Sequence, residues 1–278
     1  MSTVKMLSYI KRDSPVHRLN GVTKLITFLA WTIVCMLSYD TRVLLTAMVF
    51  SLIIFKLAKI HLKEVGFILV FICFFLLLND AAIYFFSPEE GVKIYGARHL
   101  IFQISDRYTV TQEQLFYLFN VTLKYLTVVP IALLFLLTTD PSEFAASLTG
   151  IRVPYKISYA VSITLRYIAD IQTDFHNISQ AQQARGVDLS KKTSLKKRIS
   201  GITIIAVPLI FSSLDRIDLI SNAMDLRGFG KKEKRTWYSA RPFQKADYCV
   251  ITAVVILSII GLLITFLDGQ RFFNPFIS

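Results

Sequence analysis

Long runs of apolar residues dominate the pattern along this 278-residue chain. The run from Tyr248 to Leu267 carries no charge, and the run from Leu115 to Thr138 is interrupted only by Lys124 and Pro130. A bilayer with a hydrocarbon core of about 30 Å is crossed by roughly 20 helical residues. The pattern predicts five transmembrane helices, at residues 25–39, 43–55, 65–86, 115–138 and 248–267.

The first two of these runs are shorter than a bilayer requires. Lys24 precedes the first run, and Lys56 and Lys59 follow the second. Long basic side chains of this kind can carry their charge along the helix to the lipid headgroups. We therefore expect both runs to cross the membrane.

The basic residues beside these runs predict the orientation of the chain, because lysine and arginine are enriched in short cytoplasmic loops. They place the N-terminus and the loop after the second run inside the cell, and five crossings then leave the C-terminus outside. Residues 139–246 hold 17 of the 31 basic residues against nine acidic ones, which also places this region in the cytoplasm. The cytoplasmic placement of the N-terminus and of the loop after the second run rests on Lys5, Lys11, Arg12, Arg18, Lys56, Lys59 and Lys63.

The cytoplasmic region begins with helix signals. Thr139-Asp140-Pro141-Ser142-Glu143 combines a cap residue, a proline at the first helical position and a glutamate at the third. A short helix should run from there to about Leu148 and close at Gly150. Pro154 then opens a longer helix, which would extend roughly 50 Å to Gly186 and can bend or break once. Its apolar residues recur every three or four positions and form one stripe, namely Ile157, Val161, Leu165, Ile168, Ile171, Phe175 and Ile178.

A second long pattern follows a linker at residues 187–193 and a basic cluster at 196–198. Its apolar run at 201–211 contains Pro208 and is too short to cross a bilayer. We expect this run to lie at the membrane interface or beneath the spans. The stripe continues through Ile217, Ile220 and Met224.

The two long patterns end in the same short signature, 42 residues apart. The first ends Ser179-Gln180-Ala181-Gln182-Gln183-Ala184-Arg185-Gly186, and the second ends Ser221-Asn222-Ala223-Met224-Asp225-Leu226-Arg227-Gly228. Each glycine fits the left-handed position just past a helix, so each arginine lies in the last turn. One interpretation is a capped helix end whose cation complements the helix dipole. The other is a planar cation at the tip of a stiff helix that enters an acidic groove of a partner.

Composition narrows the class of protein further. The chain is 54% hydrophobic with a net charge of +12, but its basic residues lie beside the apolar runs, so we do not expect nucleic acid as a partner. The three cysteines lie in apolar runs at unrelated spacings and indicate neither a disulfide framework nor a metal site. The first 20 residues lack the long apolar region of a cleavable signal peptide. We predict an all-α polytopic membrane protein.

Candidate chemistry within the spans is sparse. Asn79, Asp80, Asn120 and Lys124 are the polar groups in or near them, and such groups are candidates for a solute path. The sequence has no phosphate-binding Gly-x-x-x-x-Gly-Lys-Ser/Thr loop and no Gly-x-Ser-x-Gly nucleophile elbow. We therefore expect no ATP site, no metal site and no catalytic activity in this chain. In the outer loop, residues 91–95 and 107–111 could pair as strands.

These features together resemble the transmembrane T component of energy-coupling factor transporters, the vitamin and metal uptake systems of prokaryotes. That family carries two Ala-Arg-Gly-type motifs at the ends of cytoplasmic coupling helices. Ala184-Arg185-Gly186 matches in full, and Leu226-Arg227-Gly228 departs at its first position. The resemblance covers almost the whole chain, including His17-Arg18-Leu19-Asn20, Thr138-Thr139-Asp140-Pro141 and Leu165-Arg166-Tyr167-Ile168. Gly21 and Lys124 stand where the family often has proline and arginine.

The resemblance implies a non-catalytic subunit in the prokaryotic plasma membrane. It would join two cytoplasmic ABC ATPases, which bind the ATP, to a membrane-embedded S component, which captures the substrate. The two arginine motifs would dock into the ATPases. The apolar stripe, including Val161, Leu165 and Ile168, would contact the S component. Independently of the resemblance, a basic cluster follows each tip within ten residues, and we expect both clusters to contact anionic lipid headgroups. The clusters are Lys196, Lys197 and Arg198, and Lys231, Lys232, Lys234 and Arg235.

Two other functions compete with this interpretation. A stand-alone permease would carry its own solute past the polar groups in the spans, and an intramembrane enzyme would need a nucleophile or a metal cluster. The coupling subunit accounts for the paired arginine tips. The expected organisation is a membrane part at residues 1–138, a cytoplasmic coupling part at 139–246 and a last span with a short tail at 247–278.

Overall fold

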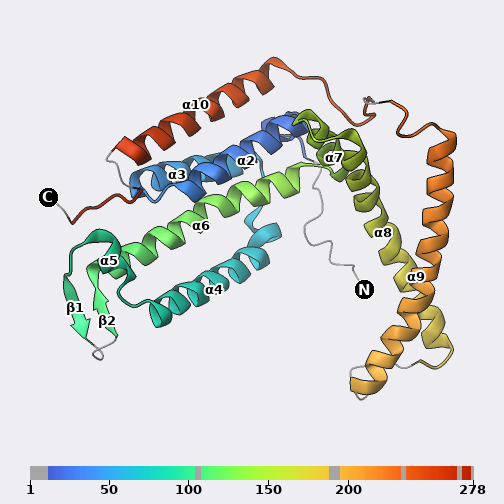
Figure 1. The fold of residues 1–278 in the computed structure, drawn as a ribbon, viewed down its shortest axis with the longest axis horizontal. Helices are drawn as coiled ribbons and strands as arrows, with labels where there is room; N and C mark the ends of the chain where they lie inside the picture. The colour runs from blue at the N-terminus through green and yellow to red at the C-terminus, as the bar shows by residue number, and fades with distance from the viewer. Residues whose placement is uncertain (1–11, 104–107, 188–194, 233–235, 268–270, 277–278) are drawn as a thin grey trace. The chain divides into compact units, whose positions relative to one another are not determined.

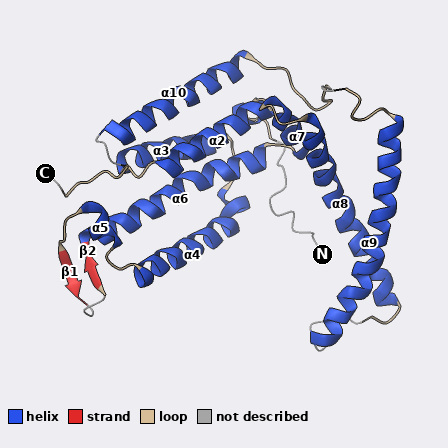
Figure 2. Cartoon of the chain, in the orientation of Figure 1, coloured by secondary structure: helices blue, strands red, loops and turns tan. Residues whose placement is uncertain are grey.

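A computed structural model describes residues 12–103, 108–187, 195–232, 236–267 and 271–276 (Figure 1). Helices make up about three quarters of this structure, with one two-stranded sheet among the described residues (Figure 2). The all-α polytopic class expected from the sequence is confirmed. The chain divides into two compact units, one formed by Met1–Asp140 with Arg241–Ser278 and the other by Pro141–Ala240.

Helix α6 is the centre of the first unit. It packs against α2, α3, α4 and α5, and α10 packs against α2 (Figure 1). The elements of this unit are α1 (Pro15–Arg18), α2 (Gly21–Leu37), α3 (Thr41–Leu57), α4 (Leu62–Phe86), α5 (Glu90–Tyr95), β1 (Leu100–Gln103), β2 (Thr109–Thr111), α6 (Gln112–Thr138) and α10 (Lys245–Leu267).

Two apolar clusters along α6 form the core of this unit. In one cluster, Leu133 and Leu137 of α6 pack with Phe55 of α3 and Val65 of α4. In the other, Leu123 and Ile131 of α6 pack with α2 and α3 through Trp31, Cys35 and Leu44. Because α6 contributes to both clusters, it fixes the positions of its neighbours.

Three described helices are long and apolar enough to cross a bilayer: Lys63–Phe86, Gln112–Thr138 and Lys245–Phe266. Helices α2 and α3 have 17 residues each. At 1.5 Å per residue they extend about 25 Å, somewhat less than a hydrocarbon core of about 30 Å. That these two helices also span the membrane stays a prediction.

Lys24 does not reach toward the headgroups, contrary to expectation. Its side chain is buried in the first turn of α2, where Nζ donates a 2.9 Å hydrogen bond to the carbonyl oxygen of Thr138. Thr138 ends α6, and the last carbonyls of a helix have no partner within the helix and attract a cation. Lys24 therefore connects two helices instead of anchoring the chain to lipid. Lys56 and Lys59 are exposed.

The outer loop also differs from the expectation. Residues 90–95 form helix α5, not a strand, and the helix ends at Gly96 in the left-handed conformation, with φ 69°. The antiparallel sheet pairs Thr109–Thr111 with Leu100–Gln103. The β-branched and aromatic residues of 91–95 suggested a strand, but Gly96 supplies a helix cap and Tyr95 is buried beside α6.

The second unit consists of α7 (Pro141–Gly150), α8 (Tyr155–Ala184) and α9 (Leu195–Leu226). Helix α7 starts at the predicted proline and packs against α8. Helix α8 is continuous over 30 residues, so the break that its length allowed does not occur. The linker expected at 187–193 lies outside the described residues apart from Val187, and so do the side chains of residues 196–198.

Helix α9 includes the apolar run at 201–211, with Pro208 inside the helix. Two residues of this run are buried, Gly201 and Ile205. Three others are exposed on the surface of the second unit, namely Ile202, Val207 and Ile210. The run is therefore the middle of a 32-residue helix with an open apolar face.

Candidate functional site

Arg185 occupies the C-terminal end of α8, and Gly186 follows it with φ +90°. The Val187 N–H donates to the carbonyl of Gln182 and the Gly186 N–H to that of Gln183, both at 3.0 Å. These two bonds constitute a Schellman motif, which closes a helix through a left-handed residue. The backbone at this tip is therefore fixed by local chemistry.

The end of α9 repeats the same geometry. Gly228 has φ +64°, and its N–H donates to the carbonyl of Asp225 at 2.9 Å. The Phe229 N–H donates to the carbonyl of Met224, also at 2.9 Å. The repeated signature thus gives two helix ends with the same backbone geometry, each presenting an arginine at the last position.

Both tips are open to solvent on the second unit. Ala184, Arg185 and Gly186 are exposed, and so is Arg227. Leu226, which departs from the alanine of the first motif, is 90% exposed.

Four aromatic residues hold the second tip against the start of α8. The Phe229 ring lies 4.8 Å from the Tyr159 ring and 5.5 Å from the Tyr155 ring, between centroids. Trp237 approaches Tyr159 at 6.2 Å and donates from Nε1 to the hydroxyl of Thr149 at 3.1 Å. The sequence pattern did not predict this cluster. Its one available signal was the large apolar residue directly after the Arg-Gly pair, where a helix end commonly makes an apolar contact.

The two tips lie at opposite ends of a crossed, antiparallel helix pair (Figure 1). Phe229, just past the end of α9, contacts Tyr159 near the start of α8, whereas Arg185 stands at the far end of α8. The 26 residues from Tyr159 to Arg185, at 1.5 Å per residue, separate the two tips by roughly 35 to 40 Å. A single small groove cannot hold both arginines.

The apolar stripe of α8 lies on a different face from the residues that contact α9. Tyr167, Asp170 and Asp174 face α9. On the stripe, Val161 and Leu165 are half-buried, and Ile168 is 47% exposed. Part of this stripe therefore has no cover within the described parts of the unit.

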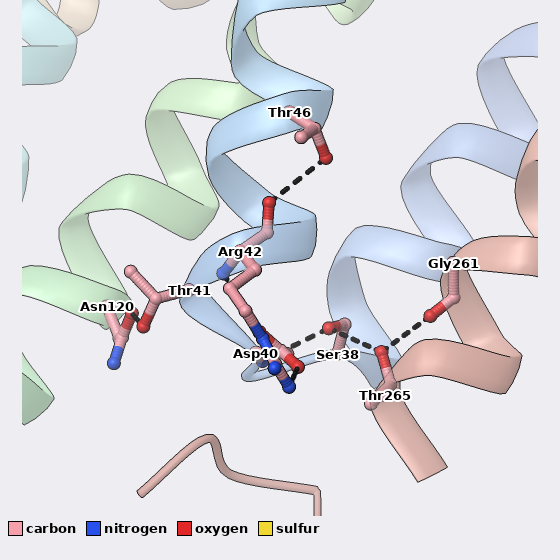
Figure 3. A network of polar contacts seen from close by, with 8 residues as sticks. All are labelled: Ser38, Asp40, Thr41, Arg42, Thr46, Asn120, Gly261 and Thr265. Atoms are coloured by element: carbon pink, nitrogen blue, oxygen red, sulfur yellow. Dashed lines mark hydrogen bonds and ion pairs between the residues drawn. The ribbon is translucent and has the colours of Figure 1, made fainter. Parts of the chain in front are cut away.

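Three of the four predicted polar groups in the spans, Asp80, Asn120 and Lys124, contact separate partners within the first unit, whereas the side-chain oxygen of Asn79 is buried without a hydrogen-bond partner among the described residues. Asp80 accepts a 2.6 Å hydrogen bond from Thr122, and Asn120 accepts one of 2.7 Å from Thr41. Lys124 donates to the carbonyl of Met36 at 2.6 Å and lies 3.5 Å from the centre of the Tyr39 ring. Figure 3 shows Asn120 with Thr41 beside a second group in which Thr265 donates to Ser38 at 2.8 Å. These contacts connect helices to one another.

The fold and these helix ends define a class: an α-helical polytopic membrane protein with a separate pair of long, arginine-tipped helices. The family model described as CbiQ, cobalt transport protein, matches residues 12–238. The chain therefore belongs to the CbiQ family of cobalt transport proteins.

Three curated relatives agree with this assignment, each named energy-coupling factor transporter transmembrane protein EcfT. The protein from Lactococcus lactis subsp. cremoris is 26% identical over 273 residues, which is 95% of this chain and 98% of the relative. The Streptococcus thermophilus protein is 28% identical, covering 91% and 95%, and the Bacillus subtilis protein is 26% identical, covering 93% and 97%. The resemblance to the T component inferred from the sequence is confirmed.

Proposed function

We propose that this chain is the coupling subunit of an energy-coupling factor importer and joins two cytoplasmic ABC ATPases to a membrane-embedded S component. The observation that carries this proposal is the pair of matched arginine tips at opposite ends of the α8–α9 pair. Two equivalent tips roughly 35 to 40 Å apart call for two equivalent sockets, and a pair of ATPase subunits supplies them.

Arg185 and Arg227 are the residues that enter the ATPases. An arginine fork matches a carboxylate in two parallel hydrogen bonds, so an acidic groove is the complementary surface. Ala184 is small and lets the first helix end approach closely, whereas Leu226 adds apolar contact at the second. Gly186 and Gly228 end the helices and so position the arginines. ATP belongs to the partner subunits, since this chain has no phosphate-binding loop.

The S component lies against the open apolar stripe of α8, at Val161, Leu165 and Ile168. The exposed face of α9, with Ile202, Val207 and Ile210, adds a second apolar surface. The area that a partner removes from water would stabilise its binding by about 25 cal/mol per Å². The S component selects the substrate, a vitamin or a transition metal ion, and this chain transmits the motion of the ATPases to it.

The unit that carries the tips faces the cytoplasm, and so does the N-terminus. The charge distribution of the sequence supports this orientation, because the basic residues concentrate there. Lys231 and Lys232, directly after the second tip, are exposed and contact anionic lipid headgroups.

The contacts of the polar span residues speak against a stand-alone permease. A solute path needs polar groups that line one continuous cavity. In the described part of the first unit, Asp80, Asn120 and Lys124 instead bond to neighbouring helices. No contact among the described residues favours the alternative of an intramembrane enzyme either.

The double variant Arg185→Glu/Arg227→Glu tests the proposal. The tagged chain is purified from its native membrane, and the ATPases that accompany it are quantified. Truncating one partner of a buried charge pair costs about 2 to 5 kcal/mol, and reversal adds repulsion. We expect the variant to reach the membrane at a normal level, because the lost dipole complement is worth only about 0.3 to 1 kcal/mol. The ATPases should be lost.

A charge-matched control reverses two exposed basic residues away from the helix tips, in Lys56→Glu/Arg166→Glu. This control should retain the ATPases. Uptake of ⁵⁷Co²⁺ and of labelled B vitamins into cells should fail in the tip variant only. ATPases retained at the wild-type level by the tip variant would refute the docking role of the arginines.

A further inference from the structure

Arg216, in the middle of α9, makes three contacts with α8. Its Nη2 lies 2.6 Å from Oδ2 of Asp174, and its Nη1 lies 3.7 Å from Oδ2 of Asp170. Its guanidinium also lies 5.6 Å from the centre of the Tyr167 ring. The side chain is 33% exposed, so the charge is partly shielded from water. One cation thus binds two successive turns of the facing helix.

The position of this contact follows the internal repeat. Asp174 and Arg216 are 42 residues apart, as are the two tip arginines, so they are equivalent positions of the repeat. Arg185 follows Asp174 by 11 residues, and Arg227 follows Arg216 by 11. In an antiparallel helix pair, a step forward along one helix lies opposite a step backward along the other. Equivalent positions of the repeat therefore lie opposite each other at one point only. The ion pair therefore lies about 16 Å along the helix from each tip.

We propose that Arg216, Asp170, Asp174 and Tyr167 form a crossing clamp that fixes the angle between α8 and α9 and thereby the separation of the two arginine tips. This inference rests on the proposed coupling function. Arg216 is a positioning residue in it, since it touches neither the ATPases nor the substrate. When one ATPase displaces the tip that it binds, the motion reaches the opposite tip only if the contact between α8 and α9 at their crossing stays intact.

The chemistry of the clamp suits this task. Apolar contacts between helices are non-directional and tolerate sliding. A charge-assisted hydrogen bond fixes both distance and direction, and the second carboxylate, one turn away, opposes rotation of the guanidinium. The equal distance to both tips means that a change of angle at the clamp displaces the two ATPase contacts equally.

The first test measures the distance between the tips. Spin labels are placed on cysteines introduced at Gln180 and Asn222, exposed and equivalent positions five residues before each tip arginine. The three native cysteines are replaced, and the complex with its ATPases is studied in lipid nanodiscs. We expect one narrow distance distribution for the parent chain. Arg216→Met, which keeps the length of the side chain and removes its charge, should broaden it, whereas the control Arg152→Met should not.

The second test measures coupling in proteoliposomes. We expect Arg216→Met to retain the ATPases but to lower uptake of the labelled vitamin or ⁵⁷Co²⁺ per ATP hydrolysed roughly fivefold, the factor that corresponds to losing one ion pair of moderate strength. The exchange variant Arg216→Asp/Asp174→Arg restores opposite charges at the crossing. It should recover both the narrow distribution and most of the uptake.

The outcomes separate this inference from the function on which it rests. A narrow distribution with unchanged uptake per ATP in Arg216→Met would overturn the clamp. An exchange variant that behaves no better than Arg216→Met would overturn it as well, since the pairing of charges would then be irrelevant. Failure of the proposed function is recognised separately, by ATPases that stay bound to Arg185→Glu/Arg227→Glu.

Discussion

The carboxylate of Asp247, in the first turn of α10, accepts a 2.8 Å hydrogen bond from the backbone N–H of Asn20, which lies 227 residues earlier in the chain. The same carboxylate accepts from the hydroxyl of Thr23 at 2.9 Å and from the N–H of Gln244 at 2.8 Å. Asp247 is only 1% exposed. One side chain therefore connects the start of the first long helix of this unit to the start of the last.

We predict that Asp247→Ala destabilises the membrane unit. Three donors lose their acceptor, and a buried donor left unsatisfied costs about 1 to 3 kcal/mol, so the loss should reach about 3 kcal/mol. Thermal unfolding in detergent measures it. Asp13→Ala is the control, because Asp13 is exposed and pairs with Arg18 on the surface. An equal melting temperature for parent and Asp247→Ala would contradict the role of this carboxylate.

The helix-ending glycines give a second prediction. Gly186 and Gly228 adopt left-handed φ values, where any side chain with a Cβ costs about 1 to 2 kcal/mol. Gly186→Ala and Gly228→Ala should loosen the tips and reduce the amount of ATPase that co-purifies. Gly186→Asn should be milder, because asparagine tolerates this conformation. The control is Gly66→Ala, because Gly66 lies within α4 and the added methyl group would have open space around it. Full ATPase retention by both alanine variants would show that tip geometry does not matter.

Leu165→Asp tests the apolar stripe of α8. A charge buried at an apolar contact without a partner is strongly unfavourable, so association with the S component should weaken at least about tenfold, equivalent to about 1.4 kcal/mol. The ATPases should stay attached, because Leu165 lies about 20 residues before the Arg185 tip and on another face from α9. Asn177→Asp, exposed and outside the stripe, is the control. Unchanged recovery of the S component would exclude this face as its docking surface.

The isolated chain should neither bind nor hydrolyse ATP, because its sequence has no loop that could hold the phosphates. Equilibrium binding of labelled ATP to the purified subunit, without its partners, measures this. Saturable binding at micromolar concentration would contradict the prediction. The same preparation, reconstituted with the ATPases, is the positive control.

Labelling of introduced cysteines tests the orientation. In a chain without its native cysteines, Ser239→Cys should react with a membrane-impermeant maleimide in inverted vesicles and not in intact cells. Tyr238→Cys is a better probe, since Tyr238 is fully exposed and Ser239 donates a 3.1 Å hydrogen bond to the carbonyl of Ser142. Ser190, a further candidate position, lies outside the described residues. Reaction of either cysteine in intact cells would show that this region lies outside the cell, opposite to the predicted orientation.

The sequence alone predicted the features that depend on neighbouring residues. The start of α7 at Pro141 follows from the proline and the acidic residue after it, and the ends of α8 and α9 follow from glycines that only a left-handed position explains. The apolar runs predicted α4, α6 and α10 because the length and composition of a span are local properties. The paired Arg-Gly signatures were sufficient to suggest the family.

The tertiary structure decided everything that depends on contacts between distant residues. Lys24 is buried because the end of α6 offers it carbonyl oxygens 114 residues away, and Asp247 groups α10 with the N-terminal helices. Residues 90–95 are helical because Gly96 caps them and α6 covers Tyr95. That Arg216 lies opposite Asp174 depends on α8 and α9 folding back on each other. Periodicity gives the face of a helix but not the partner that covers it, and for that reason only the folded chain reveals these pairs.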